Sequence, residues 1–142
     1  MKYVNSISDT YLERDKELIR LFRKAKVMVE YPTTMVKICQ YVSTMPASCY
    51  YIAESSAYRY ICKRLHGIIP KFGKNQQKKE SLCEAFYQEF LAAKEKEEFK
   101  GLSNWKLVTI VLTYPAPHLG ISPRYIQMKV SKYYRGKSVT DR

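Results

Sequence analysis

The feature that most constrains this chain is an internal repeat. Residues 35–67 align without a gap with residues 104–136, at an offset of 69, and eight aligned positions are identical. The apolar positions of the two segments also coincide. Chance similarity between amphipathic helices does not explain a shared Pro-Ala step, so we interpret the repeat as a duplicated structural unit. The identical pairs are Lys37/Lys106, Val42/Val111, Thr44/Thr113, Pro46/Pro115, Ala47/Ala116, Ile52/Ile121, Lys63/Lys132 and Gly67/Gly136.

The sequence pattern of each copy predicts three helices. Apolar residues recur at helical spacing, as at Leu18, Leu21, Phe22 and Ala25 in the first helix. Polar residues that can cap a helix precede several of these segments: Asp9 or Thr10, Thr34, Ser103 and Ser122. The second helices should stop before Pro46 and Pro115, and Gly101, Gly67 and Gly136 should end other helices. The expected spans are 9–29, 34–45 and 54–66 in the first copy, and 77–99, 103–114 and 123–135 in the second.

This pattern predicts an all-α fold of two tandem tri-helical units that resemble helix-turn-helix units. Residues 1–70 form the first predicted unit, residues 71–79 a basic linker, and residues 80–142 the second unit. The connections between second and third helices carry short apolar stretches, at 50–52 and 119–121. We expect these stretches to be extended and to pair with each other between the units.

The charge balance points to a polyanionic partner. The chain has 25 lysines and arginines against 13 acidic residues, a net charge of +12. Residues 31–79 hold eight basic side chains and one acidic, and residues 99–140 hold seven basic and none acidic, whereas residues 80–98 are acidic. Because the basic segments recur in step with the repeat, we favour nucleic acid as the partner. Pairing of these segments with the acidic first helices is the alternative explanation.

The outer faces of the third helices carry the candidate contact residues. Arginine and glutamine can read base edges in the major groove, whereas lysine and serine more often hold phosphates. Tyrosines that interleave with basic residues can contact sugar-phosphate or stack on unpaired bases. The predicted nucleic-acid-binding residues on these helices are Ser55, Ser56, Arg59, Tyr60, Lys63, Arg64, Arg124, Tyr125, Gln127, Lys129, Lys132 and Arg135, and Lys74 of the basic linker joins them.

The sequence offers no pattern that is typical of an enzyme or a cofactor site. The five glycines do not cluster into a phosphate-binding loop, and the acidic run at Glu95, Glu97 and Glu98 is a solvated surface segment. Cys62 and His66 lie four residues apart, with Cys49 as a conceivable third metal ligand, but buried free thiols are the favoured interpretation. We therefore expect no catalysis, no metal and no cofactor.

The Pro-Ala phrases that open the two connections, MPASCYYIAESSA and YPAPHLGISP, resemble a group of small bacterial proteins that often accompany mobile elements. In that group a Pro-Ala-Ser or Pro-Ala-Pro, an aromatic pair and a capped helix occur twice. The second copy here departs from the pattern, with His118, Leu119 and Gly120 in place of the usual basic and aromatic residues. The resemblance implies a duplicated architecture and assigns no activity.

Three functional hypotheses follow, and the first is favoured. It is a regulatory or accessory protein that binds duplex DNA, with its two units acting as a covalent dimer. The others are a helical module that binds an acidic protein and an RNA-binding protein, the latter favoured by an exposed row of tyrosines. Because the chain opens without a hydrophobic signal segment and has no long apolar run, we expect a soluble cytoplasmic location, at the nucleoid if the partner is DNA.

Overall fold

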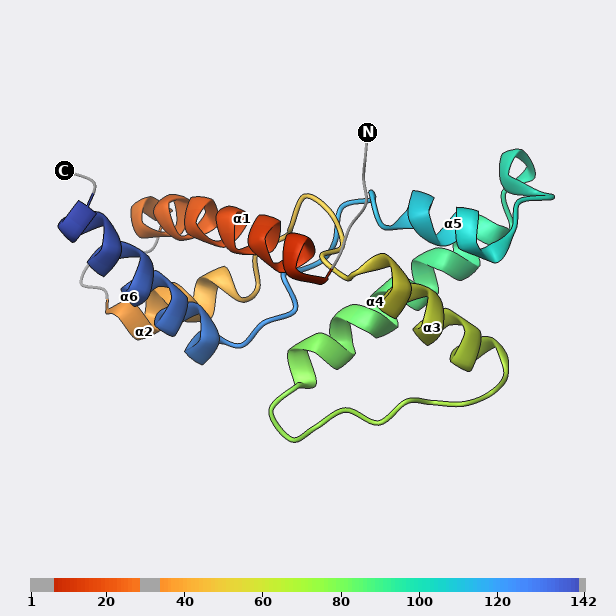
Figure 1. Cartoon of the computed structure of the whole chain (residues 1–142), viewed down its shortest axis with the longest axis horizontal. Helices are drawn as coiled ribbons and strands as arrows, with labels where there is room; N and C mark the ends of the chain where they lie inside the picture. The colour runs from red at the N-terminus through yellow and green to blue at the C-terminus, as the bar shows by residue number, and fades with distance from the viewer. Residues whose placement is uncertain (1–6, 29–33, 141–142) are drawn as a thin grey trace.

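The computed structural model describes residues 7–28 and 34–140, and within them it is all-helical, as predicted. In place of a sheet, the described part has one isolated β-bridge, between Ala47 and Ala116. Figure 1 shows an elongated molecule with helices gathered at both ends. The elements are α1 (Ile7–Met28), α2 (Met35–Val42), α3 (Glu54–Leu65), α4 (Gln77–Lys94), the 3-10 turn η1 (Glu97–Phe99), α5 (Asn104–Val111) and α6 (Pro123–Thr140).

The two copies reproduce the same local chemistry at an offset of 69 residues. The Thr34 hydroxyl accepts a hydrogen bond from the Lys37 amide, and Ser103 does the same for Lys106, so both predicted N-caps of the second helices are confirmed. The predicted cap Ser122 accepts from the Tyr125 amide at 3.2 Å. Each cap satisfies an amide that the first helical turn leaves unpaired. The two copies therefore share the capping hydrogen bonds of their second helices.

The third helices are exchanged between the two copies, which corrects the predicted tandem units. α6 packs on α1 and α2, whereas α3 packs on α4 and α5. We call the first set lobe 1 (α1, α2 and α6) and the second set lobe 2 (α3, α4 and α5); they lie at opposite ends of the molecule in Figure 1. The segment 71–79 thus separates the sequence repeats, not the two lobes.

The exchange follows from the connections between second and third helices. Each connection crosses the middle of the molecule, where Ala47 and Ala116 exchange two backbone hydrogen bonds of 3.0 Å. These alanines occupy equivalent repeat positions, so an approximate two-fold axis passes between them. A helix-turn-helix turn would return the third helix to its own unit, but this longer extended connection carries it across. The connections do pair, as expected, although through Ala47 and Ala116 and not through residues 50–52 and 119–121.

The buried apolar side chains of both lobes form one continuous core. The predicted core residues Leu18, Leu21, Phe22 and Ala25 are all buried. Connections add to this core, since Tyr50 packs its ring edge-on against Phe86 with ring centroids 5.3 Å apart. Both lobes are thus joined by packing as well as by the central bridge.

Several predicted helix ends were wrong. α1 begins at Ile7, so Asp9 and Thr10 lie inside it and not at the position that precedes it. α2 and α5 end three residues before the expected limits, where tighter turns close each helix before its proline. α4 ends at Lys94 and is followed by η1, and α6 continues through Gly136 to Thr140. By contrast, Gly67 follows α3 with a φ of 81°, the left-handed conformation predicted for a helix stop.

Within the described residues, every helix is either too short or too polar to cross a lipid bilayer. The longest, α1, contains ten charged residues.

Candidate nucleic-acid interface

Both third helices lie on the near side of the molecule in Figure 1, where α6 is drawn in front of α2 and α3 in front of α4. Each begins just after a central connection and runs toward the end of its own lobe. Their exposed positions are partly repeat-equivalent, as with Lys63 and Lys132. Of the predicted contact residues, seven are exposed: Ser55, Arg59, Lys63, Lys74, Arg124, Lys132 and Arg135.

Two predicted contact residues on α3 do not lie on its outer face. Tyr60 is buried, with its ring tilted against that of Phe72 at 6.3 Å. Arg64 donates to the Tyr60 hydroxyl and to the Glu84 carboxylate of α4, and its guanidinium lies 4.1 Å from the centre of the Tyr87 ring. The exchange is the reason, because it sets this side of α3 against α4, the first helix of the other copy, which carries Glu84 and Tyr87.

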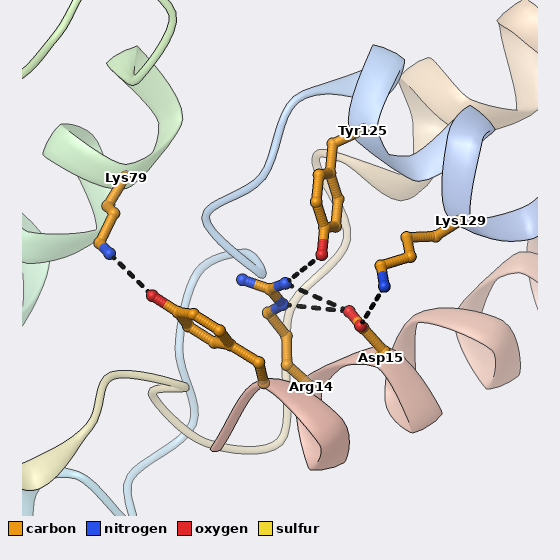
Figure 2. Close-up of polar contacts among 6 residues, drawn as sticks. Arg14, Asp15, Lys79, Tyr125 and Lys129 are labelled. Carbon is orange, nitrogen blue, oxygen red and sulfur yellow. Dashed lines mark hydrogen bonds and ion pairs between the residues drawn. The ribbon is translucent and has the colours of Figure 1, made fainter. Parts of the chain in front are cut away.

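The corresponding face of α6 is also engaged by the first helix of the other copy. Lys129 forms an ion pair with Asp15 at 3.3 Å, and the Tyr125 hydroxyl accepts a hydrogen bond of 2.7 Å from Arg14 (Figure 2). Both α6 residues are half-buried, as are the remaining predicted residues Ser56 and Gln127. Asp15 and Glu84 occupy equivalent repeat positions, so the same carboxylate position binds the exchanged helix in each lobe.

Arg14 is the centre of the polar cluster in Figure 2. Its side chain is only 10% exposed, and its guanidinium lies 4.5 Å from the centre of the Tyr11 ring and 5.0 Å from that of Tyr125. It also forms an ion pair with Asp15 at 3.2 Å. The Tyr11 hydroxyl accepts a hydrogen bond from Lys79 of α4, so the cluster joins α1 to elements of both lobes. A buried guanidinium requires such partners, and the role of this cluster is structural.

A groove of about 460 Å³ lies between α1 and α6. We call it the α1–α6 groove. Its apolar lining comes from Leu12, Ile19 and the ring of Tyr133, and Asp15 is the single carboxylate among its lining residues. Five basic side chains line it as well: Lys16, Arg20, Arg23, Lys129 and Lys132.

The sequence interpretation missed the α1 half of this groove. Leu12, Lys16, Ile19 and Arg23 recur every three or four residues on the side of α1 that faces away from its predicted core stripe. That spacing was visible in the sequence. Its meaning was hidden because the exchange, which sequence does not reveal, is what brings α6 beside α1.

The lobes differ in charge. The helices of lobe 1 contain 12 basic and four acidic residues, a net charge of +8, whereas those of lobe 2 contain seven basic and four acidic residues, a net charge of +3. From Leu18 to its end α1 has no acidic residue, and α6 has none at all. The two helices run parallel, as the Arg14–Tyr125 and Arg23–Tyr133 bonds show, so their basic C-terminal halves meet at one end of the molecule.

Cys39, Cys49 and Cys83 are not activated as nucleophiles. Burial raises the pKa of the Cys39 and Cys49 thiols, and it raises that of Cys83 to about 11. Because the thiolate is the reactive form, these groups stay inert near neutral pH. In the described part of the chain no three histidine, cysteine or acidic side chains come together in a way that could hold a metal ion. His66 instead places its Nδ1 2.7 Å from the Cys62 carbonyl oxygen of its own helix.

Comparison with known protein families, curated proteins and solved structures finds no significant match.

Proposed function

We propose that this chain is a non-enzymatic regulatory or accessory protein that binds duplex DNA with the outer faces of α3 and α6. The observation that carries the proposal is the approximate two-fold relation of these helices about the Ala47–Ala116 bridge. The sugar-phosphate backbone of duplex DNA has two-fold symmetry as well. A chain with two equivalent helices on one side therefore matches it in the manner of a dimeric repressor.

The exposed side chains of these helices fit that role. Arg124, Lys132 and Arg135 follow one another along α6, and Arg59 and Lys63 lie one helical turn apart on α3. Side chains of this type supply phosphate contacts, and arginine can also reach guanine in the major groove. The excess charge of lobe 1 predicts that α6 contributes more of the affinity than α3.

The tyrosines favour duplex over single-stranded nucleic acid. Among the tyrosines whose side chains are described, Tyr41 alone is in the exposed class, at 38%. Tyr50 and Tyr60 are buried, and Tyr125 and Tyr133 are half-buried against arginines of α1. Proteins that bind single-stranded nucleic acid without sequence preference present exposed aromatic rings on which the bases stack. An exposed row of such rings is not found in the described part of this chain.

The test is binding of the full chain to a fluorescein-labelled DNA duplex across a salt series. We expect affinity to fall steeply with salt, because each neutralised phosphate releases a counterion. Replacing Arg124 and Lys132 with alanine should weaken binding at least tenfold and flatten the salt dependence. Replacing Arg59 and Lys63 with alanine should weaken binding several-fold.

The matched control removes Lys96 and Lys100, two exposed lysines in the segment between α4 and α5. This variant has the same net charge as the others, so it should bind DNA within about twofold of the unaltered chain. Equal losses in all three variants would show that only net charge matters. Affinity that does not change with salt would remove the proposal itself.

A further inference from the structure

The α1–α6 groove has a lining that phosphate contacts do not need. Leu12 leaves 56% of its surface exposed, whereas the other large apolar residues of α1 between Tyr11 and Phe22 are buried or half-buried. Ile19 and the Tyr133 ring continue this apolar surface along the groove. Tyr133 is held in place, since its hydroxyl accepts a 2.8 Å hydrogen bond from Arg23 and its ring meets that of Tyr134 edge-on. Apolar surface that is fixed and flanked by charge is typical of an interaction site.

The charges around this apolar surface are arranged in two ways. Lys16 and Arg20 lie 3.4 Å and 2.9 Å from the carboxylates of Glu13 and Glu17, and Lys129 is paired with Asp15. Arg23 is bonded to a neutral hydroxyl instead, and Lys132 is exposed on the α6 side. The groove therefore keeps a positive potential after its local ion pairs are counted. Its complement is a partner that is apolar on one side and acidic on its flanks.

We propose that the α1–α6 groove binds an amphipathic acidic helix of a partner protein. The lining residues of α1 extend from Leu12 to Arg23, which spans about 16 Å of helix axis. That length accommodates about three turns of a bound helix, with apolar anchors at i, i+3 and i+7 over Leu12, Ile19 and Tyr133. Acidic residues beside the anchors face Arg23 and Lys132. This site shares Lys132 with the proposed DNA contacts and differs from them in its need for Leu12.

The probe is a fluorescein-labelled synthetic peptide of four helical turns, with leucines at i, i+3 and i+7 and glutamates at most other positions. The control peptide has the same composition in scrambled order, so charge is matched and the apolar stripe is lost. Anisotropy on the full chain should show saturable binding of the amphipathic peptide. The scrambled peptide should bind at least tenfold more weakly.

Leu12→Ser is the decisive variant, because it removes apolar surface without changing charge at an exposed position that the core does not use. It should weaken peptide binding about tenfold, the loss expected when one leucine contact of about 1.4 kcal/mol disappears. It should leave DNA affinity within twofold. Replacing Arg23 and Lys132 together with glutamine should also weaken peptide binding. Circular dichroism of both variants checks that they are folded.

Three results would overturn the proposal. Equal binding of the two peptides would reduce the interaction to charge alone. Unchanged peptide affinity in Leu12→Ser would place the peptide elsewhere. A loss of DNA affinity in Leu12→Ser as large as the loss of peptide affinity would assign the groove to nucleic acid. The proposed function can be judged separately, because of its DNA contacts only Lys132 lines the groove, whereas Arg59, Lys63 and Arg124 do not.

Discussion

Lobes 1 and 2 are assembled by the same exchange of third helices, yet they attach their central connections by different chemistry. In lobe 1 the buried carboxylate of Glu17 accepts hydrogen bonds from the Ser48 amide, the Ser48 hydroxyl and the Tyr51 hydroxyl. In the second copy Phe86 and Gly120 replace Glu17 and Tyr51 at the equivalent positions. There the connection packs closely on α4, where Gly120 lies directly against the Leu82 side chain.

This difference shows which features the two copies still share after duplication and which have diverged. The caps of the second helices and the central backbone bridge recur at equivalent positions in both copies. The side chains that fasten each connection needed only to fill space and satisfy polar groups. A charged network and an apolar contact meet that requirement equally well, so the two attachments diverged. We call the attachment around Glu17 the polar joint and the attachment around Gly120 the apolar joint.

The largest expected effect comes from the polar joint. Glu17→Ala leaves the Ser48 amide and two hydroxyls without their shared acceptor, and hydrogen bonds to a charged group contribute about 1.5 kcal/mol each. We expect the free energy of unfolding in urea to fall by about 4 kcal/mol. Glu13→Ala is the control, since Glu13 is 63% exposed and should change stability by less than about 0.5 kcal/mol. A loss below about 1 kcal/mol for Glu17→Ala would mean that the two joints do not differ as described.

The apolar joint is tested by a pair of glycines that share the same backbone conformation. Gly120 and Gly67 both have a φ of 81°, but a Cβ at Gly120 would lie 2.6 Å from Leu82 Cδ2, whereas one at Gly67 would meet nothing within 4 Å. Gly67→Ala should cost about 1 kcal/mol for its backbone conformation. Gly120→Ala should cost about 3 kcal/mol, because overpacking adds to that cost. Equal losses in urea unfolding would show that Leu82 moves aside freely.

The sequence predicted much of this local structure but not the exchange. Periodicity located every helix, and the caps at Thr34, Ser103 and Ser122 were identified because capping depends on neighbours in the chain. Which lobe receives α3 depends on the path of a connection held by Ala47 and Ala116, 69 residues apart, and no local pattern encodes that path. The buried position of Tyr60 was missed for the same reason. The groove between α1 and α6 exists because of the exchange, so the sequence did not predict it either.

Acid should weaken the two joints in different pH windows. Burial, with Lys78 nearby, lowers the pKa of His118, and its neutral Nδ1 accepts a 2.9 Å hydrogen bond from the Gly120 amide. A lowered histidine pKa gives stability that is complete above the unfolded value of about 6.5 and is lost as pH falls through the folded value. Burial alone would raise the pKa of Glu17, but the bonds from Ser48 and Tyr51 outweigh it and lower the pKa.

The stability that Glu17 contributes is therefore present above its unfolded pKa and is lost as pH falls further, through its folded value. Urea unfolding from pH 7.5 to pH 3 should show a first decline in mild acid that His118→Gln abolishes. A second decline below about pH 4.5 should be reduced by Glu17→Gln. If His118→Gln removed the low-pH decline instead, the joints would be assigned to the wrong groups.

The smallest effect is expected where the lobes are most alike, at the ion pairs of Asp15 and Glu84 with the exchanged helices. Double-mutant cycles combine Asp15→Asn with Lys129→Met, and Glu84→Gln with Arg64→Met. Both pairs are partly exposed, at 23% and 32% in lobe 1 and 48% and 15% in lobe 2, so each coupling energy should be about 0.5 kcal/mol. Both couplings should shrink in high salt.

The single substitutions should nevertheless separate the lobes. Asp15 also binds the buried guanidinium of Arg14, so Asp15→Asn should cost more than Glu84→Gln, by about 1 kcal/mol. Arg64→Met should cost more than its coupling energy, because Arg64 also lies against the Tyr87 ring. Coupling energies well above 1 kcal/mol would contradict this account. They would mean that the exchanged helices are stabilised mainly by the equivalent carboxylates Asp15 and Glu84, and not by the two joints that differ.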